Sequence, residues 1–407
     1  METGTILDAR YSWVRLGLTL LIAVVGNVGM WVITVVMPEV QAEFAATRAQ
    51  ASMPYVTTMI GFALGNMFIG RAVDRFGMST ALTGAGVLIA VGYGLAAFAP
   101  SIWVLSLVQL AIGFGTASCF GPLIADISQW FMKRRGIAVA IAASGNYLSG
   151  AIWPPLLSWV GADAGWRWVY SALAVVTVLI MLPLAQLLRR RVPAEALLQA
   201  DAVSSSRSAK TGFSPRQLQW MLGAAGIGCC VAMSMPQVHI VALCVDMGFG
   251  AAVGAEMLSL MLLGGVVSRL ISGVLADRLG GVRTLLIGST LQCIALFLYL
   301  PAGGLVSLYS VSFVFGLSQG GIVPSYAVIV REYLPAREAG ARVGFVMMMT
   351  IMGMALGGWL SGAIYDWTGS YQWAFVNGIV WNGVNIAIMI VILTRGNRAR
   401  GAALQAA

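Results

Sequence analysis

One arginine lies deep inside an otherwise apolar run of the chain. Arg269 stands in the stretch Val-Val-Ser-Arg-Leu, seven residues before the end of the run 252–276. If that run spans a membrane, a charge at this depth costs about 2.5–3.5 kcal/mol and indicates function. A guanidinium keeps its charge and can bind a carboxylate through two parallel hydrogen bonds. We therefore expect Arg269 to bind an anion. The alternative is a fixed ion pair with a neighbouring helix, although no acid lies one turn away in the same run.

A second candidate for chemistry is His239, the only histidine of the chain. Histidine titrates near neutral pH and can carry a proton. Pro236 lies one turn earlier and should loosen a helix there, an arrangement found near transport sites. Asp246 follows seven residues later on the same helical face, where it can pair with His239, with Arg269 or with water. We expect His239 and Asp246 to couple protons; the alternative for His239 is a hydrogen-bonded packing role.

Uncharged polar residues also lie in the middle of apolar runs. Tyrosine and amide side chains can orient a small polar ligand in a mostly apolar cavity. Each can equally serve as a hydrogen bond between helices. The residues that we expect to line a cavity are Asn27, Asn146, Tyr147, Gln319 and Tyr326.

The elements that must position these residues are long apolar segments. The chain has 407 residues, of which 59% are hydrophobic and only 10% are charged, whereas soluble domains average about 25% charged residues. Runs of about 20 apolar residues are long enough to span a bilayer as helices. This composition predicts an all-α membrane protein with twelve spans, at 15–37, 52–72, 79–98, 103–127, 136–159, 168–188, 218–245, 252–276, 283–301, 304–329, 341–364 and 372–394.

A motif occurs twice at the same position of two half-chains. Gly-Arg-Ala-Val-Asp-Arg-Phe-Gly at 70–77 and Gly-Val-Leu-Ala-Asp-Arg-Leu-Gly at 273–280 are 203 residues apart, and Arg134 and Arg337 share this offset. A repeat of half the chain predicts two pseudo-symmetric six-helix halves that rock against each other. We expect one half at 1–188, a flexible polar linker at 189–216 and the second half at 217–407.

The loop carboxylates of this motif are expected to act as gating latches rather than to touch a ligand. We interpret Asp74, Arg75, Asp277 and Arg278 as parts of cytoplasmic latches that lock the outward-facing state, with Asp126 as the partner of Arg75.

The net charge of +9 has an uneven distribution along the chain. Of 24 lysines and arginines, 21 fall in the two tails or in loops after even-numbered spans, and the other loops hold only Arg48 and Arg167. This asymmetry places both termini in the cytoplasm. It argues against a nucleic-acid partner and for contact with an anionic lipid bilayer.

The sequence offers no chemistry for an enzyme. It has no nucleophile–base set, no metal-ligand spacing and no phosphate-binding glycine loop with a lysine, and the five cysteines read as small core residues. We therefore expect no cofactor, no metal and no nucleotide, so that any transport must draw on ion gradients.

The repeated Gly-x-x-x-Asp-Arg-x-Gly loop resembles the signature of the major facilitator superfamily, and the resemblance covers essentially the whole chain. Trp130-Phe131 through Arg135-Gly136, Pro154-Pro155 and Gly165-Trp166-Arg167 are similar to the monocarboxylate porters and oxalate/formate exchangers. That resemblance implies a substrate-anchoring arginine in span 8, which Arg269 matches. Gly265 stands where eukaryotic porters place an aspartate, and spans 11 and 12 lack the lysine of the exchangers.

Together these observations predict a secondary carrier in the cell (inner) membrane. We expect it to move a small organic anion, a monocarboxylate such as lactate, with protons by alternating access. The alternatives are a drug or neutral-solute carrier, an organic-anion exchanger, and a membrane receptor without turnover.

The charge asymmetry generates a topology prediction. A fusion-reporter or cysteine-accessibility map should place residues 189–216 and both termini in the cytoplasm, because positively charged loops are retained on that side. A reporter in the linker that is found outside would contradict the predicted orientation.

Overall fold

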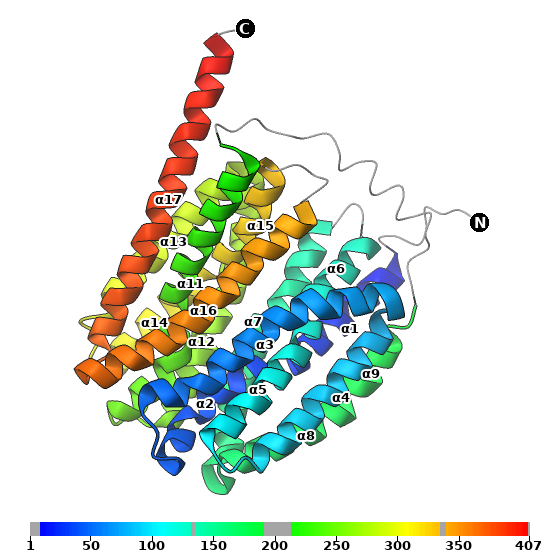
Figure 1. Ribbon diagram of the computed structural model, residues 1–407, viewed down its shortest axis with the longest axis vertical. Coiled ribbons are helices and arrows are strands. Elements are labelled where there is room, and N and C mark those ends of the chain that lie inside the picture. The colour runs from blue at the N-terminus through cyan, green and yellow to red at the C-terminus, as the bar shows by residue number, and fades with distance from the viewer. Residues whose placement is uncertain (1–8, 132–134, 191–212, 334–338, 406–407) are drawn as a thin grey trace.

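The computed structural model describes residues 9–131, 135–190, 213–333 and 339–405, and these form helices joined by short turns, with no strand among them. Figure 1 shows the helices packed side by side with roughly parallel or antiparallel axes. The helices before the predicted linker are α1 (Arg10–Gly26), α2 (Val28–Glu43), α3 (Arg48–Phe76), α4 (Met78–Ala97), α5 (Ile102–Thr116), η2 (Ala117–Cys119), α6 (Gly121–Trp130), α7 (Arg135–Ala164), α8 (Trp166–Val176), η3 (Thr177–Met181) and α9 (Leu182–Leu187). Those after it are α11 (Pro215–Asp246), α12 (Ala251–Leu279), α13 (Gly281–Tyr299), α14 (Leu305–Gln319), α15 (Ile322–Tyr333), α16 (Ala339–Thr368) and α17 (Gln372–Gln405).

Ten helical segments of the described residues are long and apolar enough to cross a membrane. Several of them combine two consecutive helices, such as α1 with α2 and α14 with α15. The predicted all-helical, membrane-spanning class is therefore confirmed. Two further predicted spans, 52–72 and 136–159, fall on the helices α3 and α7, which have 29 and 30 residues; the count of twelve spans stays a prediction.

The helices before and after the predicted linker form two groups in the molecule. In Figure 1, α1–α9 lie on one side and α11–α17 on the other. The sides are joined where α3 packs on α16, α7 on α12, and α2 on both α11 and α12. The start of α1 and the end of α17 lie at one end of the bundle, and we call the opposite end, where α2 ends and α3 begins, the far end.

Both copies of the repeated motif end in the same backbone geometry. Gly77 follows α3 with φ 89° and ψ 162°, and Gly280 follows α12 with φ 83° and ψ 160°. This left-handed conformation is unfavourable for residues with a Cβ, and it stops one helix so that the next can start directly. The glycine at the end of each motif is thus explained by the reversal between α3 and α4 and between α12 and α13.

Close helix packing fixes the neighbourhood of Arg269. A Cβ on Gly316 would lie 1.9 Å from the Met261 carbonyl oxygen, and one on Gly320 would lie 2.0 Å from that of Gly265. Helices α12 and α14 can approach this closely only because these positions lack side chains, as expected where small residues drive helix association. The backbone carbonyls of the junction between α14 and α15 thereby come within reach of side chains on α12.

Parts of three predicted segments lie outside the described residues. They are the linker from 191 to 212, residues 132–134 between α6 and α7, and residues 334–338 between α15 and α16. Helix α11 begins at Pro215 with a Ser214 capping box, just inside the end of the predicted linker.

Candidate transport site

Arg269 lies between three helical elements and is only 5% exposed. From α12, its Nη1 donates a hydrogen bond of 2.6 Å to the Ala143 carbonyl oxygen on α7. Its Nε donates to the Gly320 carbonyl oxygen at 3.2 Å, at the junction of α14 and α15. The guanidinium carbon lies 4.0 Å from the centre of the Tyr147 ring, also on α7. Arg269 therefore links α7, on one side of the bundle, with α12 and α14, on the other.

No carboxylate neutralises Arg269 within the described residues. The ion pairs found there join Arg15 to Asp126, Arg48 to Asp246 and Arg167 to Glu43. A guanidinium has five N–H donors, and the two carbonyl bonds of Arg269 use two of them. Among the described residues, Arg269 thus does not form the fixed ion pair with a neighbouring helix that was the predicted alternative. A buried charge that carbonyl dipoles and an aromatic ring hold, without a counter-charge, is suited to an anion.

Gly265, one turn before Arg269, provides the space for Tyr147. A Cβ at Gly265 would lie 2.8 Å from two carbons of the Tyr147 ring. Such a contact is closer than packed atoms tolerate. The position where the resembled porters carry an aspartate is therefore filled here by the tyrosine ring that covers Arg269.

Two of the predicted cavity residues, each next in the chain to a residue that contacts Arg269, keep unused hydrogen-bonding capacity. Asn146 precedes Tyr147, is 8% exposed, and its Oδ1 has no hydrogen-bond partner in the described structure. Gln319 precedes Gly320 and accepts a hydrogen bond of 2.7 Å from Gln237 Nε2, while its own Nε2 has no such partner there. Buried polar groups without partners are uncommon and call for an explanation. The two unpartnered groups are therefore candidates for contact with a polar ligand.

The other two predicted cavity residues have different surroundings. Asn27 donates hydrogen bonds to the carbonyl oxygens of Ala23 and Cys119, at 2.8 and 3.0 Å, and so bridges the break between α1 and α2 to η2. Tyr326 donates to Asn385 Oδ1 at 3.0 Å in a network that also includes Ser289. Both residues therefore form hydrogen bonds between helices, which is the alternative to a cavity role.

A cluster of charged and aromatic residues joins the helix ends at the far end of the bundle. We call Arg48, Asp246, Tyr365, Asp366 and Tyr371 the Arg48 cluster. Arg48 Nη2 donates to both oxygens of Asp246, at 2.8 and 2.9 Å. Asp366 accepts the backbone N–H groups of Arg48 and Ala49, both at 2.8 Å, and so caps the start of α3. The Arg48 guanidinium lies 5.0 Å from the Tyr365 ring and 6.0 Å from the Tyr371 ring.

This cluster corrects the expected partners of Asp246. The sequence offered His239, Arg269 or water, whereas the structure pairs Asp246 with Arg48, 198 residues away in the chain. Helical spacing places Asp246 on the same side of α11 as His239, but it does not reveal that α3 begins opposite the end of α11. That proximity depends on the packing of the two sides of the bundle.

His239 is fully buried and both of its ring nitrogens have partners. Nε2 lies 2.8 Å from the Gly358 carbonyl oxygen, and Nδ1 lies 3.1 Å from the Tyr371 hydroxyl. Because a carbonyl oxygen only accepts, Nε2 carries a hydrogen, and Nδ1 of a neutral imidazole then accepts from Tyr371. These contacts match the packing alternative. They also connect His239, through Tyr371, to the Arg48 cluster that contains Asp246.

The latch role of Asp126 stays a prediction, and the expected pairing with Arg75 is not found: Arg15 is the partner of Asp126. Its two oxygens accept hydrogen bonds from Nε and Nη2 of Arg15, both at 2.8 Å. The Arg15 guanidinium also lies over the Trp130 ring at 4.7 Å and is nearly fully buried. Sequence reasoning missed Arg15 because it marks the edge of the first apolar run, where an arginine usually reaches water.

Of the remaining latch residues, the structure describes the side chains of Arg75 and Arg278 only. Arg75 lies against the ring of its neighbour Phe76, at 5.2 Å, and Arg278 is exposed. The side chains of Asp74 and Asp277 are outside the described structure. The latch role of these four residues stays a prediction.

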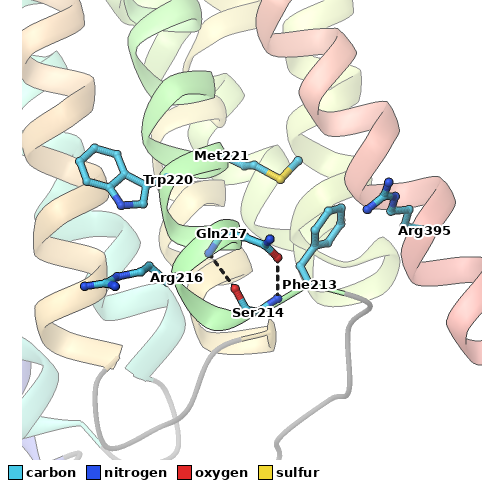
Figure 2. Close-up of a pocket in the computed structure, with 7 residues that line it drawn as sticks. All are labelled: Phe213, Ser214, Arg216, Gln217, Trp220, Met221 and Arg395. Carbon is cyan, nitrogen blue, oxygen red and sulfur yellow. Dashed lines mark hydrogen bonds between the residues drawn. The ribbon is translucent and has the colours of Figure 1, made fainter.

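A surface recess of about 470 Å³ lies between the start of α11 and α17. Figure 2 shows Arg216 and Trp220 on one side of the Ser214–Gln217 turn and Arg395 with Phe213 on the other. Since the two guanidinium groups do not converge, we place the candidate site at Arg269 instead.

Comparisons with known proteins agree with this geometry. The profile of the Major Facilitator Superfamily matches residues 19–340 and 221–406, and the chain belongs to this family of transporters. Monocarboxylate transporter 13 of Bos taurus is 31% identical over 76% of this chain and 72% of its own length. Monocarboxylate transporter 11 of Homo sapiens is 31% identical over 76% and 67%, respectively.

The match to solved structures concerns the fold. A bacterial homologue of the human lysosomal transporter Spinster, in an inward-facing and occupied conformation, aligns with a TM-score of 0.70 at 16% identity. The alignment covers 95% of this chain and 97% of that one. Membership of the Major Facilitator Superfamily makes the protein a multi-pass membrane transporter and not an enzyme, as the sequence predicted.

The contrast between two ion pairs generates a stability prediction. Asp126→Asn should lower the free energy of unfolding by about 3–5 kcal/mol, because it leaves the buried Arg15 charge without its carboxylate. Glu43→Gln is the matched control, since Glu43 and Arg167 are 41% and 38% exposed and such pairs contribute only about 0–1 kcal/mol. Thermal unfolding of the detergent-solubilised variants measures both effects. Equal losses in the two variants would contradict the assigned role of Arg15.

Proposed function

We propose that this protein is a secondary active transporter that moves a small organic anion, a monocarboxylate such as lactate, together with protons by alternating access. The observation that carries the proposal is Arg269, a buried guanidinium without a carboxylate partner among the described residues. An arginine in such a position is costly, and a bound anion offsets that cost while it occupies the site.

The surroundings of Arg269 favour a carboxylate with a single charge. The carbonyl oxygens of Ala143 and Gly320 hold two edges of the guanidinium, and the Tyr147 ring covers one face. The donors that remain can form two parallel hydrogen bonds with one carboxylate. The nearby amides of Asn146 and Gln319 are uncharged, so they suit a neutral polar substituent rather than a second carboxylate.

The relatives support the same substrate class. Two of them carry the name monocarboxylate transporter, and each is 31% identical to this chain. The buried arginine and the relatives' names are independent arguments, since the first rests on contacts and the second on overall similarity.

The proposed mechanism needs two halves that move against each other. We assign them to residues 1–188 and 217–407, joined by the linker 189–216, with α3 and α7 added to the ten apolar segments to make twelve spans. Arg269 and its contacts on α7 would lie where the halves meet. We place the protein in the cell (inner) membrane with both termini cytoplasmic, on the charge asymmetry alone.

We assign the proton to His239 and Asp246 at the far end. The Tyr371 hydroxyl contacts His239, and the Arg48 guanidinium lies over the Tyr371 ring. Arg48 in turn forms an ion pair with Asp246. Protonation of either group would change the hydrogen bonds or the charge balance of this contact between α3, α11 and α16. A proton could thus bias the opening of the far end without touching the substrate.

The anion assignment generates a prediction about Arg269. Arg269→Lys keeps the charge but loses the planar pair of donors, and hydrogen bonds to charged groups contribute about 1.5–3 kcal/mol. Labelled lactate uptake into reconstituted vesicles at low substrate concentration should fall by at least about tenfold, since every 1.4 kcal/mol is a factor of ten. Arg269→Ala should abolish it.

The matched control is Arg283→Lys, because Arg283 is an exposed arginine on α13. This variant should retain uptake within about twofold, as surface substitutions have small effects. Unchanged carboxylate uptake in Arg269→Ala would remove Arg269 from the site and favour a neutral-solute carrier.

The coupling assignment generates a separate prediction. His239→Gln and Asp246→Asn should retain exchange of labelled for unlabelled substrate, because Arg269 still binds the anion from either side. Net uptake that a pH gradient drives should collapse, since the group that carries the proton is gone. Both modes are measured in the same vesicles. Full pH-driven accumulation in both variants would show that the proton takes another route.

A further inference from the structure

We propose that Arg48 is a second anion-binding group, and that a substrate carboxylate displaces Asp246 from it and thereby opens the far end of the bundle. The inference rests on the proposed function in one respect, namely that the transported solute is a carboxylate. It assigns to the far end a binding step separate from that at Arg269.

The Arg48 cluster spans the contact between the two sides of the bundle. Arg48 begins α3, Asp246 ends α11, and Asp366 lies in the last turn of α16. Figure 1 shows the start of α3 beside the end of α16, at the far end. A Cβ at Gly362 would lie 2.9 Å from both the Arg48 carbonyl oxygen and Ser52 Oγ, so α3 and α16 are in direct contact there. The cluster therefore closes the far end.

The hydrogen bonds of Arg48 leave its guanidinium incompletely used. One nitrogen, Nη2, serves both oxygens of Asp246, and Nε is buried without a hydrogen-bond partner in the described part of the chain. A free carboxylate can engage Nε and Nη2 together through two parallel hydrogen bonds, which is the stronger arrangement. Asp246 is held at the end of a helix and does not adopt this arrangement here. Its side chain is 27% exposed, so an arriving anion can reach the pair.

The charged residues at the far end single out Arg48 as the group that could bind an anion. The other arginine at this end, Arg167, already binds Glu43 and the carbonyl oxygens of Ala97 and Ala99. The remaining charged side chains described there are acidic: Glu39, Asp163, Glu256 and Asp366. Arg48 is therefore the basic group described at this end that keeps an unpartnered N–H, and its guanidinium faces Tyr365 and Tyr371 as that of Arg269 faces Tyr147. Two arginines set against tyrosine rings thus mark two points along the proposed path.

Displacement of Asp246 by the substrate would shift the conformational equilibrium of the far end toward the open state. A ligand shifts a conformational equilibrium only by its differential affinity for the two states. With Asp246 on Arg48 the closed state is favoured, and a carboxylate that takes Arg48 binds the open state better. The empty protein then stays closed at this end, because nothing else replaces Asp246.

The test uses Ser52→Cys as a reporter of opening. Ser52 is fully buried against α16, so a thiol reagent should label the introduced cysteine only when α3 and α16 separate. The parent chain without this substitution gives the background from its own cysteines. Lactate and propionate are the carboxylate probes, and methyl lactate is the uncharged control. Vesicles with the far end facing outward give the Michaelis constant for lactate uptake from the far side. Inverted vesicles give the Michaelis constant from the opposite side.

We expect lactate and propionate, but not methyl lactate, to accelerate labelling of Ser52→Cys. Asp246→Asn should label fast without any ligand. Arg48→Gln should also label fast, and added carboxylate should not change its labelling rate. Its Michaelis constant for lactate should be at least about tenfold higher from the far side, as the loss of a charged hydrogen-bond pair predicts. The Michaelis constant from the opposite side should not change. Thermal unfolding and size-exclusion profiles of every variant show whether it folds. Arg48→Lys, which keeps the charge, is the reference for Arg48→Gln.

Two results would overturn the inference. One is carboxylate acceleration of labelling that persists in Arg48→Gln, and the other is an unchanged far-side Michaelis constant in that variant; each would make Arg48 a structural contact only. Failure of the proposed function looks different. In that case neither the parent chain nor any variant, Arg269→Ala included, would take up lactate or propionate. Asp246→Asn would still label fast, because the closed contact has lost its charge pair.

Discussion

The structure depends on how positive charge is accommodated inside an apolar bundle. A guanidinium cannot lose its proton, so burial requires carboxylates, carbonyl dipoles or aromatic faces around it. Arg15 and Arg48 are held by aspartates, and Arg269 by carbonyl oxygens and a tyrosine ring. The first two arginines stabilise contacts that already carry balanced charge. Arg269 keeps an uncompensated charge, which is why the transport site is assigned to it.

The position of Arg269 depends in turn on residues without side chains. Gly316 and Gly320 let α12 and α14 approach until the Gly320 carbonyl oxygen, at the junction of α14 and α15, reaches the guanidinium. Gly265 makes room for Tyr147. A methyl group at any of these places would push apart the helices or the ring that hold the arginine. Close packing and the electrostatics of the site are therefore one constraint, because the dipoles that hold the charge come from backbone that only glycine brings near.

The far end shows how one contact can serve two purposes. Arg48 packs the start of α3 against the ends of α11 and α16, and its charge pair with Asp246 makes that contact reversible. A purely apolar contact of the same area would close this end but would not respond to an anion. His239 joins the same contact through Tyr371. The residues proposed to sense the proton and the anion are thus adjacent, although neither touches Arg269 through the contacts described.

The sequence by itself determined the features that are local or additive along the chain. Hydrophobic runs predicted helices, the repeated motif marked the ends of the apolar runs that form α3 and α12, and a lone charge in an apolar run drew attention to Arg269. Only the tertiary structure decided which charges meet. Asp246 pairs with Arg48 across 198 residues, and Asp126 pairs with Arg15 across 111. Helical periodicity gives the face on which a side chain lies, but an ion pair also requires that two particular helix ends pack together, and that is settled by how the whole bundle closes.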